Sequence, residues 1–264
     1  MKVLFLGEIT AKAGLDAVRD GLRPYVKEQG VDLVIANGEG VTSGFGIGTQ
    51  HAMTLFKYGI DIITGGEKIF FKLDMQEFIT RKDRILRPAN YPGDVPGRGC
   101  RFYNVGSQKV SVINLLGMTD FNCHLDNPFP QAEFLVSKAL EQTPFVFLVF
   151  HAGTTAEKAS MGYLLDGKAS AVIGTHTKVM TADARLLPRG TAYISDNGRC
   201  GSFMSVGGFA PENEIQKFTT GLYRRSTECF DDVRLQGALV EVGPDGRAVS
   251  ISAVNLPVGK KEQS

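Results

Sequence analysis

Short apolar runs recur along the 264 residues of this chain, and each run ends in a cluster of small or polar residues. Continuous runs of this length, rich in β-branched residues, are typical of strands that are buried on both faces. They occupy residues 3–6, 33–36, 60–64, 110–113, 145–150, 171–173 and 192–195. The chain is therefore expected to build its core around a sheet that is covered on both sides.

Helical spacing of apolar residues falls between many of these runs. It covers residues 15–28, 49–58, 73–80, 132–141 and 212–220. Alternation of strands and helices predicts an α/β fold with largely parallel or mixed sheets. Near the end, residues 235–242 and 248–254 flank Gly243-Pro244-Asp245-Gly246, which predicts a hairpin on a sheet edge.

The length fits one α/β domain over residues 1–264, with residues 259–264 expected to form a frayed tail. Apolar residues make up 43% and charged residues 22%, which is ordinary for a globular protein. A net charge of +1 argues against binding of duplex nucleic acid. The apolar start is too short for a signal peptide or membrane span, and the four cysteines show no CxxC spacing. We therefore expect a cytoplasmic protein without a membrane partner.

Polar side chains follow most of the predicted strands. In open α/β sheets, ligands bind outside the carboxyl ends of the strands, so these positions are candidates for an active site. The chain has four histidines, and two of them directly follow strands. A metal or phosphate site is the natural prediction. Its candidate residues are Glu8, Asn37, Glu39, Glu67, Asn114, His151, His176, Lys178 and Asp196.

Several stretches, taken together and in order, resemble one known family. They are Arg87-Pro88-Ala89-Asn90-Tyr91-Pro92, Asp126-Asn127-Pro128-Phe129, residues 166–177, Thr181-Ala182-Asp183 and residues 187–196. On these stretches the chain resembles the YmdB-like branch of the calcineurin-like metallophosphoesterases, described as 2′,3′-cyclic-nucleotide phosphodiesterases. The resemblance covers nearly the whole chain. It implies a four-layer αββα sandwich of the metallophosphoesterase type, with mixed sheets and a two-metal site at the sheet edge.

The metal-binding motifs of that family are only partly kept. Gly-Asp becomes Gly7-Glu8, Asn-Gly-Glu-Asn becomes Asn37-Gly38-Glu39-Gly40, Gly-Asn-His becomes Gly65-Gly66-Glu67, His-Ala-Glu becomes His151-Ala152-Gly153, and Gly-Thr-His-Thr-His becomes Gly174-Thr175-His176-Thr177-Lys178. Glycine offers no ligand atom, and an ammonium group repels a nearby dication. The resemblance therefore implies that the first metal site is lost, with Lys178 in its place and paired with Glu8.

The residues that remain suggest a second, mononuclear site. The resemblance implies Glu39, His151 and His176 as its ligands, with Glu8 as a further carboxylate. Such a set can hold one Mn, Fe or Zn ion. Alternatively, both histidines are only hydrogen-bonded at strand ends. Glu67 replaces the family's catalytic histidine: it would be a general acid if its pKa were raised, an added ligand, or an ordinary loop glutamate.

Two functions are favoured by this pattern, and a purely structural oligomer is a third alternative. The first is a non-catalytic binding or regulatory protein that has lost the two-metal phosphodiesterase site. The alternative is a single-metal phosphoesterase that acts on a nucleotide-like phosphodiester, with Glu67 and Lys178 in catalytic roles. A nucleotide or phosphodiester is the expected ligand, one divalent metal is the only expected cofactor, and the resemblance implies a homo-oligomer. Arg199 is expected at the surface.

Overall fold

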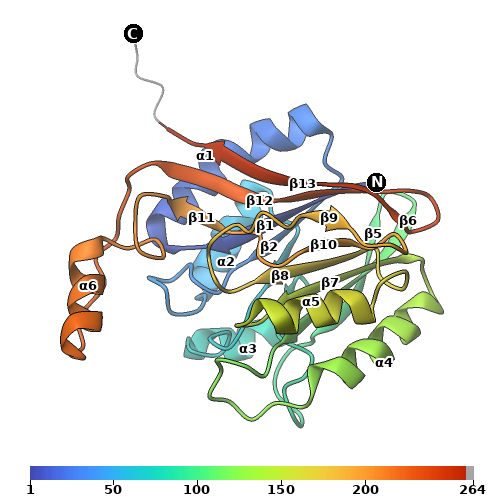
Figure 1. The fold of residues 1–264 in the computed structure, drawn as a ribbon, viewed down its shortest axis with the longest axis horizontal. Coiled ribbons are helices and arrows are strands. Elements are labelled where there is room, and N and C mark those ends of the chain that lie inside the picture. Colours follow the sequence, from blue (N-terminus) through green and yellow to red (C-terminus); the bar gives the residue numbers. More distant parts are fainter. Residues whose placement is uncertain (260–264) are drawn as a thin grey trace.

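The computed structural model describes residues 1–259, in which two sheets pack face to face (Figure 1). Within this part of the chain the first sheet has seven strands, in the order β13 (Ala248–Pro257), β12 (Val233–Val242), β11 (Arg199–Ser202), β1 (Lys2–Ile9), β2 (Leu33–Asn37), β3 (Ile62–Thr64) and β4 (Ile85–Leu86). Strand β1 is parallel to β2 and β11 and antiparallel to β12. The sheet is therefore mixed, as the sequence predicts.

The second sheet has six strands over the same described range, in the order β5 (Cys100–Val105), β6 (Gln108–Leu116), β7 (Phe145–His151), β8 (Ala171–Thr175), β10 (Ala192–Ile194) and β9 (Arg185–Leu186). Its four central strands run parallel, and both edge strands are antiparallel to their neighbours. The carboxyl ends of the parallel strands in each sheet therefore share one edge.

Helices cover the outer face of each sheet. Those on the first sheet are α1 (Ala11–Gln29), α2 (Thr49–Tyr58) and α3 (Leu73–Arg81), and those on the second are α4 (Pro128–Leu140) and α5 (Thr155–Leu164). Helix α6 (Pro211–Thr220) buries none of its side chains and stands away from the body of the fold (Figure 1). None of the helices described is both long and apolar enough to cross a membrane.

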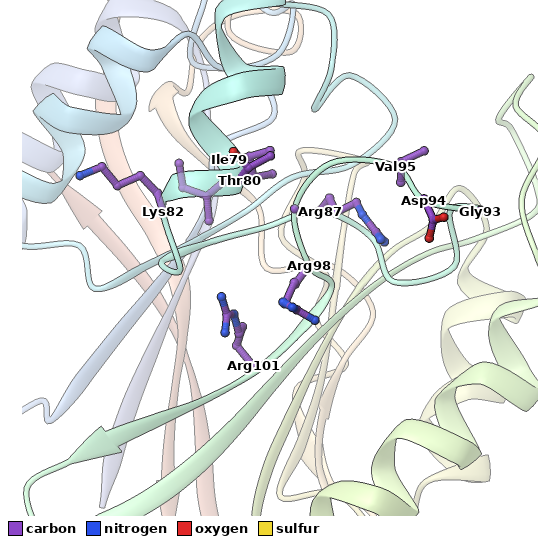
Figure 2. A pocket seen from close by; sticks show the side chains of 11 residues that line it. Ile79, Thr80, Lys82, Arg87, Gly93, Asp94, Val95, Arg98 and Arg101 are labelled. Atoms are coloured by element: carbon purple, nitrogen blue, oxygen red, sulfur yellow. The ribbon is translucent and has the colours of Figure 1, made fainter.

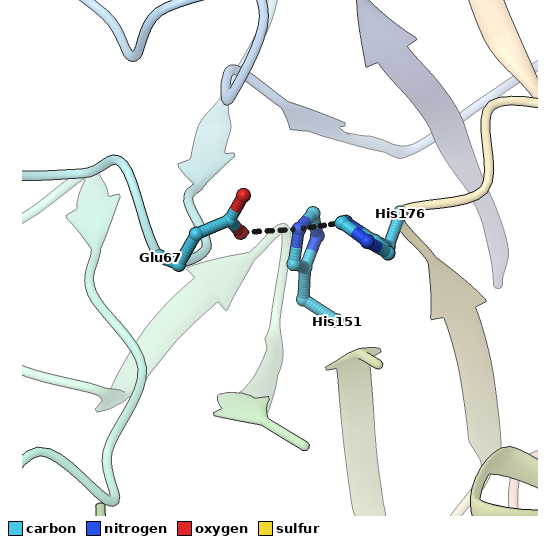
Figure 3. Close-up of side chains that lie close together, drawn as sticks. All are labelled: Glu67, His151 and His176. Carbon is cyan, nitrogen blue, oxygen red and sulfur yellow. Dashed lines mark hydrogen bonds and ion pairs between the residues drawn. The ribbon is translucent and has the colours of Figure 1, made fainter. Parts of the chain in front are cut away.

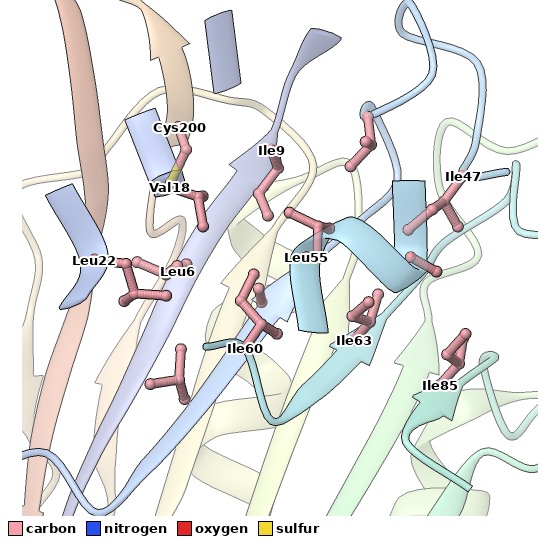
Figure 4. Packing of buried hydrophobic residues seen from close by; sticks show 14 of the residues in the cluster. Leu6, Ile9, Val18, Leu22, Ile47, Leu55, Ile60, Ile63, Ile85 and Cys200 are labelled. Atoms are coloured by element: carbon pink, nitrogen blue, oxygen red, sulfur yellow. The ribbon is translucent and has the colours of Figure 1, made fainter. Parts of the chain in front are cut away.

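Three apolar clusters hold these layers together. One lies between α1, α2 and the first sheet, where Leu22 and Leu55 are fully buried (Figure 4). A second lies between the two sheets, where the rings of Phe5 and Phe147 meet edge to face at 5.7 Å. The third joins the second sheet to α4 and α5. This order of layers confirms the αββα sandwich.

Most predicted elements are confirmed, with shifted ends. The predicted hairpin is formed by β12 and β13, and β13 is an edge strand. Helix α5 and strands β4, β5, β9 and β11 were not predicted. Helix α5 does carry a start signal, because Thr154 caps it by accepting a hydrogen bond from the backbone N–H of Glu157. The predicted tail covers residues 259–264. Residues 260–264 lie outside the part of the chain that the structure describes.

Candidate active site

The candidate site lies where strands of both sheets end. Glu8 is close to the end of β1, and Glu39 and Glu67 follow β2 and β3 in the first sheet. His151 ends β7, and His176 directly follows β8 in the second sheet. Because the parallel strands of each sheet point to the same edge, residues far apart in the sequence meet there.

Glu67, His151 and His176 come together in a compact group (Figure 3). Nε2 of His151 lies 3.0 Å from Oε2 of Glu67 and 3.0 Å from Nδ1 of His176. One possible ligand atom from each residue falls within 4.8 Å of the others. One carboxylate and two imidazoles at this spacing fit a site for a single Mn, Fe or Zn ion.

The ring of His151 is fixed from its other side. The side-chain oxygen of Asn37 accepts the backbone N–H of Glu39 at 2.8 Å, so its amide nitrogen faces Nδ1 of His151 at 3.1 Å. The hydroxyl of Thr175 lies 2.9 Å from the same nitrogen. His151 is completely buried, so these partners set its orientation.

The protonation states follow from burial and charge. Burial disfavours the charged forms of both Glu67 and His151, but their mutual hydrogen bond and charges outweigh it, so the pKa of Glu67 is lowered and that of His151 is raised. Burial, together with the charge of His151, lowers the pKa of His176 to about 3. His176 is therefore a neutral imidazole at neutral pH, and Glu67 is ionised. A raised pKa, which a general acid at Glu67 would need, is not observed.

Glu39 faces a different set of partners. Its carboxylate is fully buried and accepts the backbone N–H groups of Gly66 and Lys68. Burial raises its pKa to about 7. These bonds fix the loop that carries Glu67. The structure thus brings His151 and His176 together with Glu67, while Glu39 supports the backbone beside them.

Glu8 and Lys178 form the ion pair that the sequence predicted, with Oε1 and Nζ 3.0 Å apart. The carboxylate of Glu8 is 1% exposed. Gly40 makes room for it, because a Cβ atom at position 40 would overlap Oε1 of Glu8. The carboxylate of Glu8 therefore depends on the absence of a side chain at position 40.

Two other glycines in the motifs also leave space for a neighbouring side chain. A Cβ atom on Gly66 would overlap the ring of His151, and one on Gly153 would overlap the carboxylate of Asp120. Side chains from elsewhere in the fold therefore occupy the space beside Gly40, Gly66 and Gly153.

The coupling of positions 8 and 40 can be measured. Gly40→Asn should destabilise the protein by about 1–3 kcal/mol, because the new side chain overlaps the buried carboxylate of Glu8. In the Glu8→Asp background the carboxylate retracts by one methylene, so the same change should cost much less. Urea unfolding of the four proteins in this double-mutant cycle gives the interaction free energy. An equal cost of Gly40→Asn in both backgrounds would contradict the coupling.

A buried ion pair supports the loop of His176. Nζ of Lys158 on α5 lies 2.9 Å from Oδ2 of Asp196, and both side chains are 1% exposed. The same carboxylate accepts the backbone N–H of Thr177 at 2.8 Å. In this loop His176 has φ of 108° and Lys178 has φ of 61°, which are uncommon for residues with side chains.

The expectation that Arg199 is a surface residue is wrong. It is 6% exposed, and its guanidinium donates hydrogen bonds to the carbonyl oxygens of Lys178, Ser202 and Phe203. It therefore holds the loop of Lys178. Asn114, a candidate site residue, instead donates from its amide to the carbonyl oxygens of Gly65 and Leu86.

Known proteins resemble this chain in sequence and in fold. The sequence model of the YmdB-like protein family matches residues 4–254. The chain belongs to the YmdB-like family. A 2′,3′-cyclic-nucleotide 2′-phosphodiesterase of Bacillus subtilis (strain 168) is 37% identical over 242 residues, which cover 92% of this chain and 91% of that protein.

Two solved structures support the assignment of the fold. A hypothetical protein of Thermus thermophilus has a TM-score of 0.91 and 33% identity, covering 98% of this chain and all of that one. A phosphatase of Mycoplasma pneumoniae also has a TM-score of 0.91, with 32% identity and coverage of 97% and 93%. The chain therefore has the fold of the metallophosphoesterases.

Sequence reasoning missed three residues beside the site. The ring of Phe121 lies 4.8 Å from that of His176 and 5.8 Å from that of His151. Nζ of Lys68 lies 3.2 Å from Oε1 of Glu67. Asp120 occupies the space at Gly153. Phe121 and Asp120 lie in a loop without strand or motif signals, whereas Lys68 directly follows a predicted site residue.

Proposed function

We propose that the protein is a single-metal phosphoesterase that acts on a nucleotide-type phosphodiester. The observation that carries this proposal is the group of Glu67, His151 and His176, whose ligand atoms lie within 4.8 Å of one another at the strand ends. The relative from Bacillus subtilis, named as a cyclic-nucleotide phosphodiesterase, supports the same substrate class. Both support hydrolysis over a non-catalytic binding or regulatory protein.

Glu67, His151 and His176 would hold the ion in this proposal. At neutral pH His176 is neutral and Glu67 is ionised, so both can act as metal ligands. His151 would release its Nε2 proton when the ion binds. With Nε2 directed at the ion, Nδ1 would carry the ring proton and donate it to the hydroxyl oxygen of Thr175, which keeps the His151 ring oriented. A bound divalent ion supplies an activated water and neutralises phosphoryl charge.

Lysine side chains provide the remaining positive charge. Nζ of Lys178 is already positioned by Glu8, and Lys68 lies against Glu67. In our proposal both ammonium groups face the phosphate, where they stabilise negative charge that develops during hydrolysis. Lys178 then supplies a fixed charge at the position where the family's motif has a histidine. Self-association of the chain stays a prediction.

Metal content can show whether Glu67 or Glu39 is the carboxylate ligand. Protein purified without chelator should contain about one equivalent of Mn, Fe or Zn and hydrolyse a 2′,3′-cyclic nucleotide. Glu67→Gln should lose the metal, because it removes the charged donor. Glu39→Gln should keep more of the metal than Glu67→Gln, because its amide oxygen still accepts one of the two backbone N–H groups that hold the Glu67 loop. Elemental mass spectrometry measures the metal content of both variants.

Glu77→Gln is the matched control, since Glu77 is 73% exposed on α3 and paired only with Arg81. Loss of metal in Glu39→Gln but not in Glu67→Gln would move the carboxylate ligand to Glu39. Wild-type protein that takes up no metal after incubation with Mn, and hydrolyses no phosphodiester, would overturn the proposal and favour the non-catalytic function.

A further inference from the structure

A cavity of about 380 Å³ lies at the outer edge of both sheets, between the end of α3, β4, β5 and the loop that joins the two strands (Figure 2). This volume is at the lower end of the range of about 300–1,000 Å³ that is typical of small-molecule sites. The cavity shares no lining residue with the group of Glu67, His151 and His176. It is therefore a separate candidate site.

Basic side chains dominate the lining. They are Lys82, Arg87, Arg98 and Arg101. Asp94 is the one acidic side chain among the lining residues, and Arg101 pairs with Asp83 just outside it. Figure 2 shows Lys82 directed away from the three arginines, so three guanidinium groups face two carboxylates and one positive charge has no counter-charge among the described residues around the cavity.

Two of the arginines are held side by side with free donors. The backbone N–H of Arg87 donates to the carbonyl oxygen of Arg98 at 3.1 Å, and Figure 2 shows Arg98 between Arg87 and Arg101. Nη1 of Arg87 donates to the carbonyl oxygen of Pro88 at 2.7 Å, which fixes its guanidinium. Within residues 1–259, neither Nη2 of Arg87 nor any side-chain nitrogen of Arg98 has a protein acceptor. These donors point to an anionic ligand.

We propose that this cavity binds the phosphate group of a phosphorylated small molecule through Arg87, Arg98 and Arg101. Guanidinium groups match the geometry of phosphate oxygens and can donate two hydrogen bonds to one group. Sites for single-stranded nucleic acid offer aromatic rings on which bases stack. Ile79, Ile85 and Val95 supply the apolar part of this lining instead, and no aromatic residue lines it in the part described. A compact phosphorylated molecule therefore fits better than an RNA strand.

Isothermal titration of the full-length, chelator-treated protein with inorganic pyrophosphate tests this proposal, because chelation removes metal-dependent binding elsewhere. Arg98→Gln should weaken pyrophosphate binding by about tenfold or more, since it removes charged hydrogen bonds. Lys27→Gln, which removes the same charge from an exposed position near the end of α1, should leave binding unchanged. Hydrolysis by Arg98→Gln should equal that of wild type, so this result is independent of the proposed function.

Further ligands identify the part of the molecule that is recognised. Glucose 6-phosphate should bind and glucose should not, because the phosphate carries the interaction. Equal pyrophosphate affinity in Arg98→Gln and Lys27→Gln, or no binding to wild-type protein, would overturn the site. A short single-stranded RNA that binds more tightly than pyrophosphate and depends on Arg98 would overturn the choice of a small molecule.

Discussion

Replacing His176 by alanine is expected to lower the rate of cyclic-nucleotide hydrolysis by about a thousandfold, because a bound metal supplies several kcal/mol of transition-state stabilisation. Burial keeps His176 neutral, and its Nδ1 lies 3.0 Å from Nε2 of His151. His176 lies in the loop after β8, so replacing its side chain should leave the fold intact. Steady-state kinetics and metal content of the purified variant measure the effect.

His124→Ala is the matched control for this change, since His124 is exposed and belongs to no metal-compatible group among the described residues. It should keep both the metal and the rate. A His176→Ala variant that keeps the wild-type rate would refute the single-metal mechanism. A variant that loses the rate but keeps one equivalent of metal would instead give His176 a role in contacting substrate.

The sheets could be predicted from sequence because their strands are buried on both faces. Strands β2, β7 and β8 are almost entirely apolar, so continuous runs mark them clearly. Strand β5 is only partly buried and mixes polar with apolar residues, and β11 is Arg199-Cys200-Gly201-Ser202. Neither has a periodic signal. Their pairing with neighbouring strands, which is a tertiary effect, decides that they are strands.

The sequence predicted which residues lie at the candidate site, but not which of them contact one another. Strand ends indicated Glu39, Glu67, His151 and His176; the last three lie together, and Glu39 holds the backbone of the Glu67 loop. Which carboxylate faces the histidines depends on the path of the loop after β3. Backbone N–H groups at 66 and 68 take both oxygens of Glu39, which leaves Glu67 directed at His151. Loop paths of this kind leave no periodic pattern in a sequence.

The structure shows which side chains surround the motif positions that the sequence analysis singled out. Considered singly, each substitution at these positions removes a ligand and suggests a lost activity. Glu8 and Lys178 instead form an ion pair in the space that Gly40 leaves open, and Asp120 fills the space at Gly153. The space beside each of these glycines is therefore filled by a side chain from another part of the fold.

Lys158→Met is expected to destabilise the protein by about 3–5 kcal/mol, because it leaves the carboxylate of Asp196 buried without its counter-charge. The effect should reach the active site, since the same carboxylate holds the backbone N–H of Thr177 beside His176. We therefore expect a melting temperature lower by roughly 10 °C and weaker metal binding. Differential scanning calorimetry and metal titration measure the two effects.

Two further variants separate lost charge balance from lost packing. Lys138→Met breaks a surface ion pair whose side chains are 58% and 60% exposed, and it should change stability by less than about 1 kcal/mol. Lys158→Met combined with Asp196→Asn removes both buried charges, so it should recover part of the loss. If the double variant were no more stable than Lys158→Met alone, an uncompensated charge on Asp196 would not explain the loss of stability.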